Sequence, residues 1–366
     1  MSFALRAVTK RYGLRTLALR EATLDVRDQE FMVLYGPAGA GKSTMLNIFA
    51  GIAKPTAGDV LQDGMSVLGV PPERRNAAMA FENYALYSHL SVFDNLAFPL
   101  RARGMGEPEI KSRVHKMAEI LGIGHVLDRR PGFLSGGQKQ RVALGRAIIR
   151  PADIYLLDEP IGHLDAKLRH RMRAELKALA QDMKSTVVFT TTSSREALAL
   201  ADRMAVINNG RIQQTGTPEE IYRQPANAFV ATFVGDPPMS LIQARVQMAG
   251  GAPMLVTQSG HVLGEAPGAL ATGGGDQRNL RIGVRSNEIR LAAPEGTGVI
   301  PGRVTSVEHL GYADIAIVDV DGDTVSITTR SDQRLRHGEL VGLSFESSAV
   351  HIFDGDRAVH HAAAGP

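Results

Sequence analysis

A glycine-rich run that ends in Lys-Ser-Thr has the composition and spacing of a phosphate-binding loop. The run consists of Gly36, Pro37, Ala38, Gly39, Ala40, Gly41, Lys42, Ser43 and Thr44. Glycines let backbone N–H groups approach a phosphate closely, and the amino end of a helix adds a favourable dipole. Lys42 would bridge the β- and γ-phosphates of a nucleotide, and Ser43 would bind Mg²⁺. The pattern therefore predicts a nucleotide site.

Two carboxylates follow the apolar run Ile154–Leu157. Asp158 stands where P-loop enzymes place a metal-side carboxylate at a strand end, so we expect it to hold Mg²⁺ through water. Glu159 comes directly after it and could accept a proton from an attacking water. The phosphate-binding loop alone is compatible with kinases, GTPases and motor ATPases. The two carboxylates reduce the number of protein classes that fit.

The run Leu134–Arg141 decides among these classes. Its Ser135, Gly136 and Gly137 predict an anion-binding nest at a helix start, with N–H groups that face a phosphate. The run resembles the LSGGQ signature of ABC ATPases. In that family the signature contacts the ATP of the other subunit, so the resemblance implies a head-to-tail dimer in which Ser135 to Gln138 contact the partner's nucleotide.

Further segments resemble the ATPases of carbohydrate importers. They are Val8–Gly13, Asn83–Val92, Asp165–Arg169, Ala201–Arg203 and Ile282–Glu288, in which Ser286 replaces the family's proline. The resemblance implies ATP and Mg²⁺ as ligands, with the Tyr12 ring stacked on adenine; the alternative for Tyr12 is a place in the core. It also implies that the C-terminal part is similar to the regulatory domain of maltose and glycerol-3-phosphate importer ATPases.

The chain departs from the family at two catalytic positions. Glu82 stands where the family has a Gln that reaches Mg²⁺ and the attacking water. Its carboxylate could still reach the metal, but it adds negative charge near the phosphates and Glu159; the alternative is a substitution without consequence. Thr192 stands at the family's switch histidine, and its hydroxyl has a shorter reach and cannot become a cation. Loss of one preorganised hydrogen-bond donor in the transition state lowers the rate of hydrolysis about 10²–10³-fold.

A smaller departure lies between these motifs. Gly162 stands where the family commonly has Ser, and His163 follows it. We expect His163 to be exposed or to pack, rather than to replace the missing catalytic histidine.

The intact signature and the altered catalytic residues together predict an unequal pair. We expect this chain to join a second, non-identical ATPase subunit, two membrane-spanning permease subunits and, through them, a solute-binding protein. Alternatives are a homodimer with slow hydrolysis, and a mainly regulatory nucleotide-binding subunit. Translation factors of this family carry two cassettes and repair proteins carry coiled coils, and this chain has one cassette and no heptads.

The motifs require a parallel α/β sheet to position them. We expect strands at Phe31–Tyr35, Ile154–Leu157 and Val187–Phe189, and helices at Lys42–Ala50 and Asp165–Asp182. Strands alternating with helices give a parallel sheet with right-handed crossovers. The expected fold is an α/β P-loop ABC ATPase domain over residues 1–235, with a helical subdomain at about 84–150.

A breaker cluster at Gly235–Pro238 separates a second part, residues 236–366, which we expect to be an all-β, OB-like domain. Its expected strands are Leu241–Met248, Leu280–Val284, Ile315–Val320, Val325–Thr329 and Val341–Phe345. Ala266–Gly275 is expected to be a loop, and Asp356–Pro366 a frayed tail.

The composition fits this organisation and excludes other classes. The 366 residues include no cysteine, which excludes disulfides and Cys-ligated zinc. A formal net charge of +3 is too small to indicate nucleic-acid binding. No apolar run approaches the ~20 residues that span a bilayer. We therefore expect any role at a membrane to come through partners, and the resemblance to importer ATPases implies a peripheral protein at the cytoplasmic face of the inner membrane.

Overall fold

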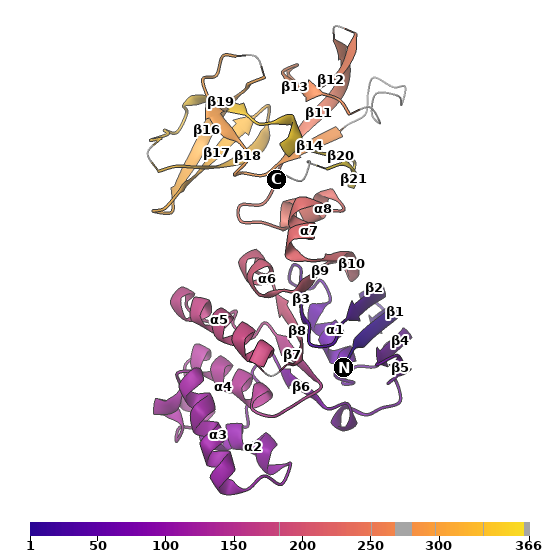
Figure 1. Cartoon of the computed structure of the whole chain (residues 1–366), viewed down its shortest axis with the longest axis vertical. Helices are drawn as coiled ribbons and strands as arrows, with labels where there is room; N and C mark the ends of the chain where they lie inside the picture. The colour runs from indigo at the N-terminus through magenta and orange to yellow at the C-terminus, as the bar shows by residue number, and fades with distance from the viewer. Residues whose placement is uncertain (183, 250, 268–279, 297, 332, 362–366) are drawn as a thin grey trace. The chain divides into compact units, whose positions relative to one another are not determined.

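The computed structural model describes the chain in six stretches, residues 1–182, 184–249, 251–267, 280–296, 298–331 and 333–361. The chain divides into two compact units, Met1–Pro218 and Glu219–Pro366 (Figure 1). Within the described residues, no helix is long and apolar enough to cross a membrane.

The first unit contains two sheets. The larger has the strand order β10-β9-β3-β8-β7-β6 and is parallel except for β10. Its strands are β3 (Phe31–Tyr35), β6 (Ala77–Ala80), β7 (Ile154–Asp158), β8 (Thr186–Thr191), β9 (Arg203–Asn208) and β10 (Arg211–Gly216). The smaller is antiparallel, with the order β2-β1-β4-β5. Its strands are β1 (Phe3–Tyr12), β2 (Thr16–Val26), β4 (Ala57–Gln62) and β5 (Met65–Ser66).

The central strands β3, β7 and β8 are buried at every position. Burial on both faces is typical of parallel strands covered by helices, and it explains why their sequences are continuous apolar runs. The three expected strands and the two expected helices are confirmed, with ends that differ by at most two residues. The helices are α1 (Lys42–Phe49), α2 (Val92–Arg101), α3 (Glu107–Ile120), α4 (Gly136–Ile148), α5 (Ala166–Asp182) and α6 (Ser194–Leu200).

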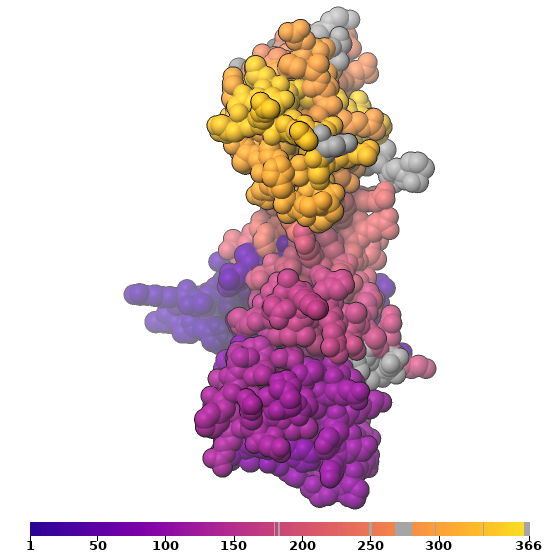
Figure 2. Space-filling view, turned by 90° about the vertical axis from the view of Figure 1, so that its left-hand side faces the viewer, coloured from indigo at the N-terminus to yellow at the C-terminus, as the bar shows by residue number. Residues whose placement is uncertain are grey.

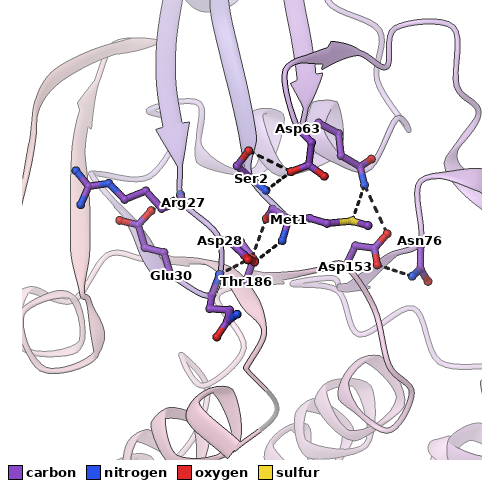
Figure 3. A network of polar contacts seen from close by, with 11 residues as sticks. Met1, Ser2, Arg27, Asp28, Glu30, Asp63, Asn76, Asp153 and Thr186 are labelled. Carbon is purple, nitrogen blue, oxygen red and sulfur yellow. Dashed lines mark hydrogen bonds and ion pairs between the residues drawn. The ribbon is translucent and has the colours of Figure 1, made fainter.

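A polar network ties the two sheets together at the amino end of β8 (Figure 3). The Thr186 hydroxyl donates to the carbonyl of Met1 at 3.0 Å and accepts the N–H of Gln29 at 3.0 Å. Ser2 donates its N–H to the Asp63 carboxylate at 2.7 Å. The bonds of Thr186 fix β1 against the amino end of β8, whereas the nucleotide-binding motifs lie at the carboxyl ends of the strands.

Helices α2, α3 and α4 form a helical lobe of the first unit, the purple surface in Figure 2. The buried Asn95 of α2 accepts the N–H of Tyr87 at 2.9 Å and donates to the carbonyls of Tyr87, Leu90 and Ser91. A buried amide that satisfies four backbone bonds fixes a loop firmly. The segment that follows Glu82 is therefore anchored on α2.

The second unit is built on two antiparallel sheets that share one apolar core. Their strand orders are β13-β12-β11-β14-β20-β21 and β15-β19-β16-β17-β18. The strands are β11 (Ser240–Ala249), β12 (Ala252–Thr257), β13 (Val262–Glu265), β14 (Leu280–Val284), β15 (Arg290–Ala292), β16 (Ile300–His309), β17 (Asp314–Val320), β18 (Asp323–Thr329), β19 (Leu340–Ser344), β20 (His351–Asp354) and β21 (Arg357–His360). All five strands expected from the sequence are confirmed.

One expectation for this unit, the frayed tail, needs correction, and another, the glycine- and alanine-rich loop, falls mostly on residues that the structure does not describe. The frayed tail expected at Asp356–Pro366 is wrong for Arg357–His360, because these residues form β21 and pair with β20. A local pattern does not reveal such a strand when its partner supplies the stability. Most of the expected loop Ala266–Gly275 lies outside the described residues.

The unit boundary differs from the one expected near residue 235. Helix α7 spans Pro218–Arg223 and helix α8 spans Ala228–Phe233. Ala228 and Ala231 of α8 share an apolar cluster with Phe353 of β20, and Arg285 links the segment of both helices to β14. Its guanidinium donates to the carbonyls of Val234 and Tyr222, each at 2.5 Å, and to that of Ala231 at 3.3 Å. The Arg285 side chain also lies 3.9 Å from the centre of the Tyr222 ring.

Arg285→Met is expected to destabilise the second unit by about 3 kcal/mol, because it leaves buried carbonyls without their charged donor. Urea unfolding followed by circular dichroism measures this loss. Arg281→Met is the matched control, since that half-buried arginine lies on the same strand and donates to the Gly355 carbonyl. Equal midpoints for the two variants would contradict the role assigned to Arg285.

Candidate nucleotide site

The glycine-rich loop connects β3 to α1 and can be built only with glycine at two of its positions. A Cβ atom on Gly36 would lie 2.2 Å from the Ile207 carbonyl oxygen. Gly41 has φ +109° and a Cβ there would lie 2.7 Å from the Ala18 carbonyl oxygen. The backbone conformation that exposes the loop's N–H groups therefore depends on these glycines.

Lys42 is folded back over this loop. Its ammonium donates to the carbonyls of Gly36 at 2.8 Å and Pro37 at 3.1 Å, and its side chain is only 5% exposed. Nζ also lies 3.5 Å from Oε1 of Glu159. The lysine charge is thus held between the loop and the carboxylate that follows β7.

Ser43 and Asp158 meet at the carboxyl end of the sheet. The Ser43 hydroxyl donates to Oδ1 of Asp158 at 3.1 Å. A hydroxyl and a carboxylate oxygen are ligands that suit Mg²⁺, which keeps its remaining positions for water and phosphate oxygens. The sequence placed these two residues 115 positions apart, and the P-loop topology brings them together.

Glu159 occupies the turn after β7 with φ +43°, in the left-handed region that side chains rarely adopt. Burial raises the pKa of its carboxyl group, Lys42 lowers it, and the negative charge of Glu82 raises it. Glu82 itself is exposed, and its charge acts on the Glu159 carboxyl group. A partly buried carboxylate of raised pKa suits proton transfer.

Glu82 and Thr192 lie just beyond the carboxyl ends of β6 and β8, and both side chains are exposed. Neighbouring Thr191 is buried and donates to the Glu196 carboxylate at 2.6 Å. No group of three or more His, Cys, Asp or Glu side chains in the described part of the chain could hold a metal ion, so Glu82 does not complete a carboxylate cluster.

The signature residues form the first turn of α4. Ser135 accepts the Gln138 N–H at 3.3 Å, and the Gln138 side chain accepts the Ser135 N–H at 2.9 Å. This reciprocal pair is a capping box, which satisfies two of the helix's free donors. Gly136 is exposed and Gly137 is half-buried, and neither carries a side chain that would cover the helix start.

The remaining predicted residues are exposed. Tyr12 is 43% exposed, which excludes a core role, and Lys10 Nζ lies 4.7 Å from its ring centre. His163 is exposed, and Nδ1 lies 3.3 Å from the Tyr84 hydroxyl. This agrees with the expectation that His163 is exposed or packs.

Two polar residues at the site escaped the sequence reasoning. Thr190 is fully buried, and its hydroxyl donates to Oδ1 of Asp158 at 2.7 Å. Gln140 is 3% exposed, and its amide donates to the Glu159 carbonyl at 2.8 Å. The sequence does contain one signal for Thr190: a threonine follows the apolar run Val187–Phe189 before the strand ends.

The sequence is similar to known families and proteins. The ABC transporter family matches residues 19–162, and the TOBE domain family matches residues 282–353. The trehalose/maltose import ATP-binding protein of Thermococcus litoralis is 41% identical over 355 residues, which cover 92% of this chain and 93% of that protein. The sn-glycerol-3-phosphate import ATP-binding protein of Pectobacterium atrosepticum is 42% identical over 350 residues, 96% of each chain.

A solved structure is similar to part of the fold. The dimeric structure of a bacterial ABC transporter cassette matches with a TM-score of 0.56 and 30% identity, over 59% of this chain and 98% of that chain. A post-hydrolysis cassette bound to ADP and Pi matches with a TM-score of 0.56 and 29% identity.

Proposed function

The chain belongs to the ABC transporter ATP-binding proteins of sugar and glycerol-phosphate importers, and we propose that it couples ATP binding and hydrolysis to uptake of a sugar, a polyol such as glycerol, or a glycerol phosphate. The observation that carries the proposal is the meeting of Lys42, Ser43, Asp158 and Glu159 at one edge of the sheet. The chain acts at the cytoplasmic face of the inner membrane, bound to two permease subunits that receive cargo from a solute-binding protein.

The residues divide the work of hydrolysis among them. Lys42 exchanges the carbonyls of its own loop for the β- and γ-phosphate oxygens of ATP. Ser43 and Asp158 would hold Mg²⁺, which neutralises phosphate charge when bound. Glu159 accepts a proton from the attacking water, and the exposed Tyr12 ring stacks on adenine.

Hydrolysis at this chain's own site is slow in this proposal. Thr192 lacks the reach and the charge of an imidazole beside the γ-phosphate. Glu82 brings a carboxylate where a neutral amide would orient the metal and the water, and like charges near phosphates oppose binding. The intact Glu159 keeps the site capable of turnover.

An unequal pair follows from this asymmetry. The chain offers Ser135 to Gln138 to the competent site of a second, non-identical ATPase subunit, and holds its own ATP in the slow site. Affinity capture of the tagged chain from its source cells tests this arrangement. We expect an ATPase that has Gln and His at the positions of Glu82 and Thr192; recovery of this chain alone with the permease subunits would contradict the unequal pair.

Lys42→Ala is expected to weaken ATP binding about 10–100-fold, because a charge-assisted bond to the phosphates is lost. In a strain that lacks the chain, the same variant should fail to restore uptake of labelled maltose, trehalose, glycerol or glycerol 3-phosphate. Lys54→Ala, an exposed lysine outside the loop, is the control. Normal uptake of all four compounds in the deletion strain would contradict the transport proposal.

A further inference from the structure

The geometry points to Thr190 and Gln140 as positioning residues that together fix the backbone of Glu159 and so aim its carboxylate. The inference rests on the proposed ATPase function, in which Glu159 accepts the proton. We assign both residues an action through the backbone of Glu159, and Thr190 also contacts Asp158. They come from separate elements, β8 and the signature helix α4, which approach the same turn from different directions.

Thr190 holds the amino side of Glu159. Its hydroxyl accepts the Glu159 N–H at 2.9 Å and donates to Oδ1 of Asp158 at 2.7 Å. A hydroxyl has one proton, so the bond to Asp158 leaves a lone pair directed at the Glu159 N–H. The parallel register places Asp158 beside Thr190 in the neighbouring strand, and the contact is therefore built into the sheet.

Gln140 holds the carbonyl side of the same residue. Its Nε2 donates to the Glu159 carbonyl at 2.8 Å, and its Oε1 accepts the His163 N–H at 3.2 Å. The donor and the acceptor of one amide each meet a complementary backbone group, which defines the orientation of the amide. Gln140 thus binds both ends of the turn from Glu159 to His163.

The conformation of Glu159 explains why such a clamp is needed. At φ +43° a non-glycine residue is strained, and the surroundings must hold it there. Relaxation to an ordinary φ would rotate the N–H or the carbonyl away from its buried partner. The carboxylate, which lies 3.5 Å from Lys42 Nζ, would move with it. A displacement of about 1 Å at a reacting group costs on the order of 10²-fold in rate.

Thr190→Val keeps the shape of the side chain and removes the hydroxyl. Single-turnover hydrolysis of γ-labelled ATP by the full chain should fall about 10–100-fold, while the Kd for ATP measured in EDTA stays within about twofold. Thr190→Ser should restore most of the rate. Gln140→Met should lower the rate in the same way and leave the Kd unchanged.

Thr186→Val is the matched control, because the Thr186 hydroxyl on the same strand also donates once and accepts once. It lies at the far end of β8, so it should lower Tm as Thr190→Val does and leave the rate unchanged. Equal rate losses from Thr186→Val and Thr190→Val, or no rescue by Ser, would overturn the clamp in favour of a purely structural role.

A double-variant comparison separates failure of the clamp from failure of the proposed function. In a Glu159→Gln background, Thr190→Val should cause no further loss of rate, since it acts through that carboxylate. A further loss would overturn the clamp. If Glu159→Gln alone leaves hydrolysis unchanged, the proposed catalytic role of Glu159 fails; if only Thr190→Val and Gln140→Met leave it unchanged, the clamp alone fails.

Discussion

Combining Glu82→Gln with Thr192→His in the full chain is expected to raise ATP hydrolysis about 10²–10³-fold, the value of one donor aimed at developing charge. The side chain at position 192 follows β8 directly and is exposed, so an imidazole meets no packed neighbour there. Steady-state phosphate release measures the gain. Thr192→Ser with Glu82→Asp is the control, because it changes both residues and adds no donor.

The same pair of variants has a pH signature. Glu159 must be ionised to accept a proton. Burial raises the pKa of Glu159, and the negative charge of Glu82 adds to this rise. Glu82→Gln removes that charge, so the pKa falls and hydrolysis persists to lower pH. If the wild-type chain already matches the rate of the double variant, neither departure impairs the site.

Glu159→Gln is expected to lower single-turnover hydrolysis about 10²–10⁴-fold, which is the usual contribution of a general base. Binding of ATP should stay the same or become tighter, because the variant removes a carboxylate 3.5 Å from Lys42 and frees that ammonium for phosphate. Filter binding and quenched-flow hydrolysis separate the two effects.

Glu109→Gln, an exposed carboxylate of α3, is the control for Glu159→Gln. A loss of ATP affinity that equals the loss of rate would contradict the role of Glu159, because it would show that the carboxylate serves binding rather than proton transfer.

The local sequence pattern was sufficient to predict elements that are buried along their whole length and motifs made of consecutive residues. Phe31–Tyr35 is predicted with its exact bounds because all five residues are buried between neighbours of the same sheet. The loop of Gly36 to Thr44 is recognisable because its chemistry is confined to consecutive residues. Five strands of the second unit could be predicted because each is a short run of apolar residues, some alternating with polar ones.

Features that depend on distant partners could not be predicted. The contact between Thr190 and Asp158 depends on the register of β8 against β7, which no local pattern encodes. The strand Arg357–His360 exists because β20 supplies its hydrogen bonds. The boundary between the units lies at Pro218 rather than near residue 235. Arg285 binds carbonyls of the α7 and α8 segment, and this link joins residues that are far apart in the sequence.

The capping box at the start of α4 has a consequence for assembly. Ser135 and Gln138 satisfy each other without any nucleotide, so the first turn of this helix is already formed in the free chain. A surface that is ordered beforehand loses little conformational entropy when a partner docks on it. Closure of this chain on its partner ATPase subunit should therefore be limited by the encounter of the two surfaces rather than by folding of this chain's signature segment.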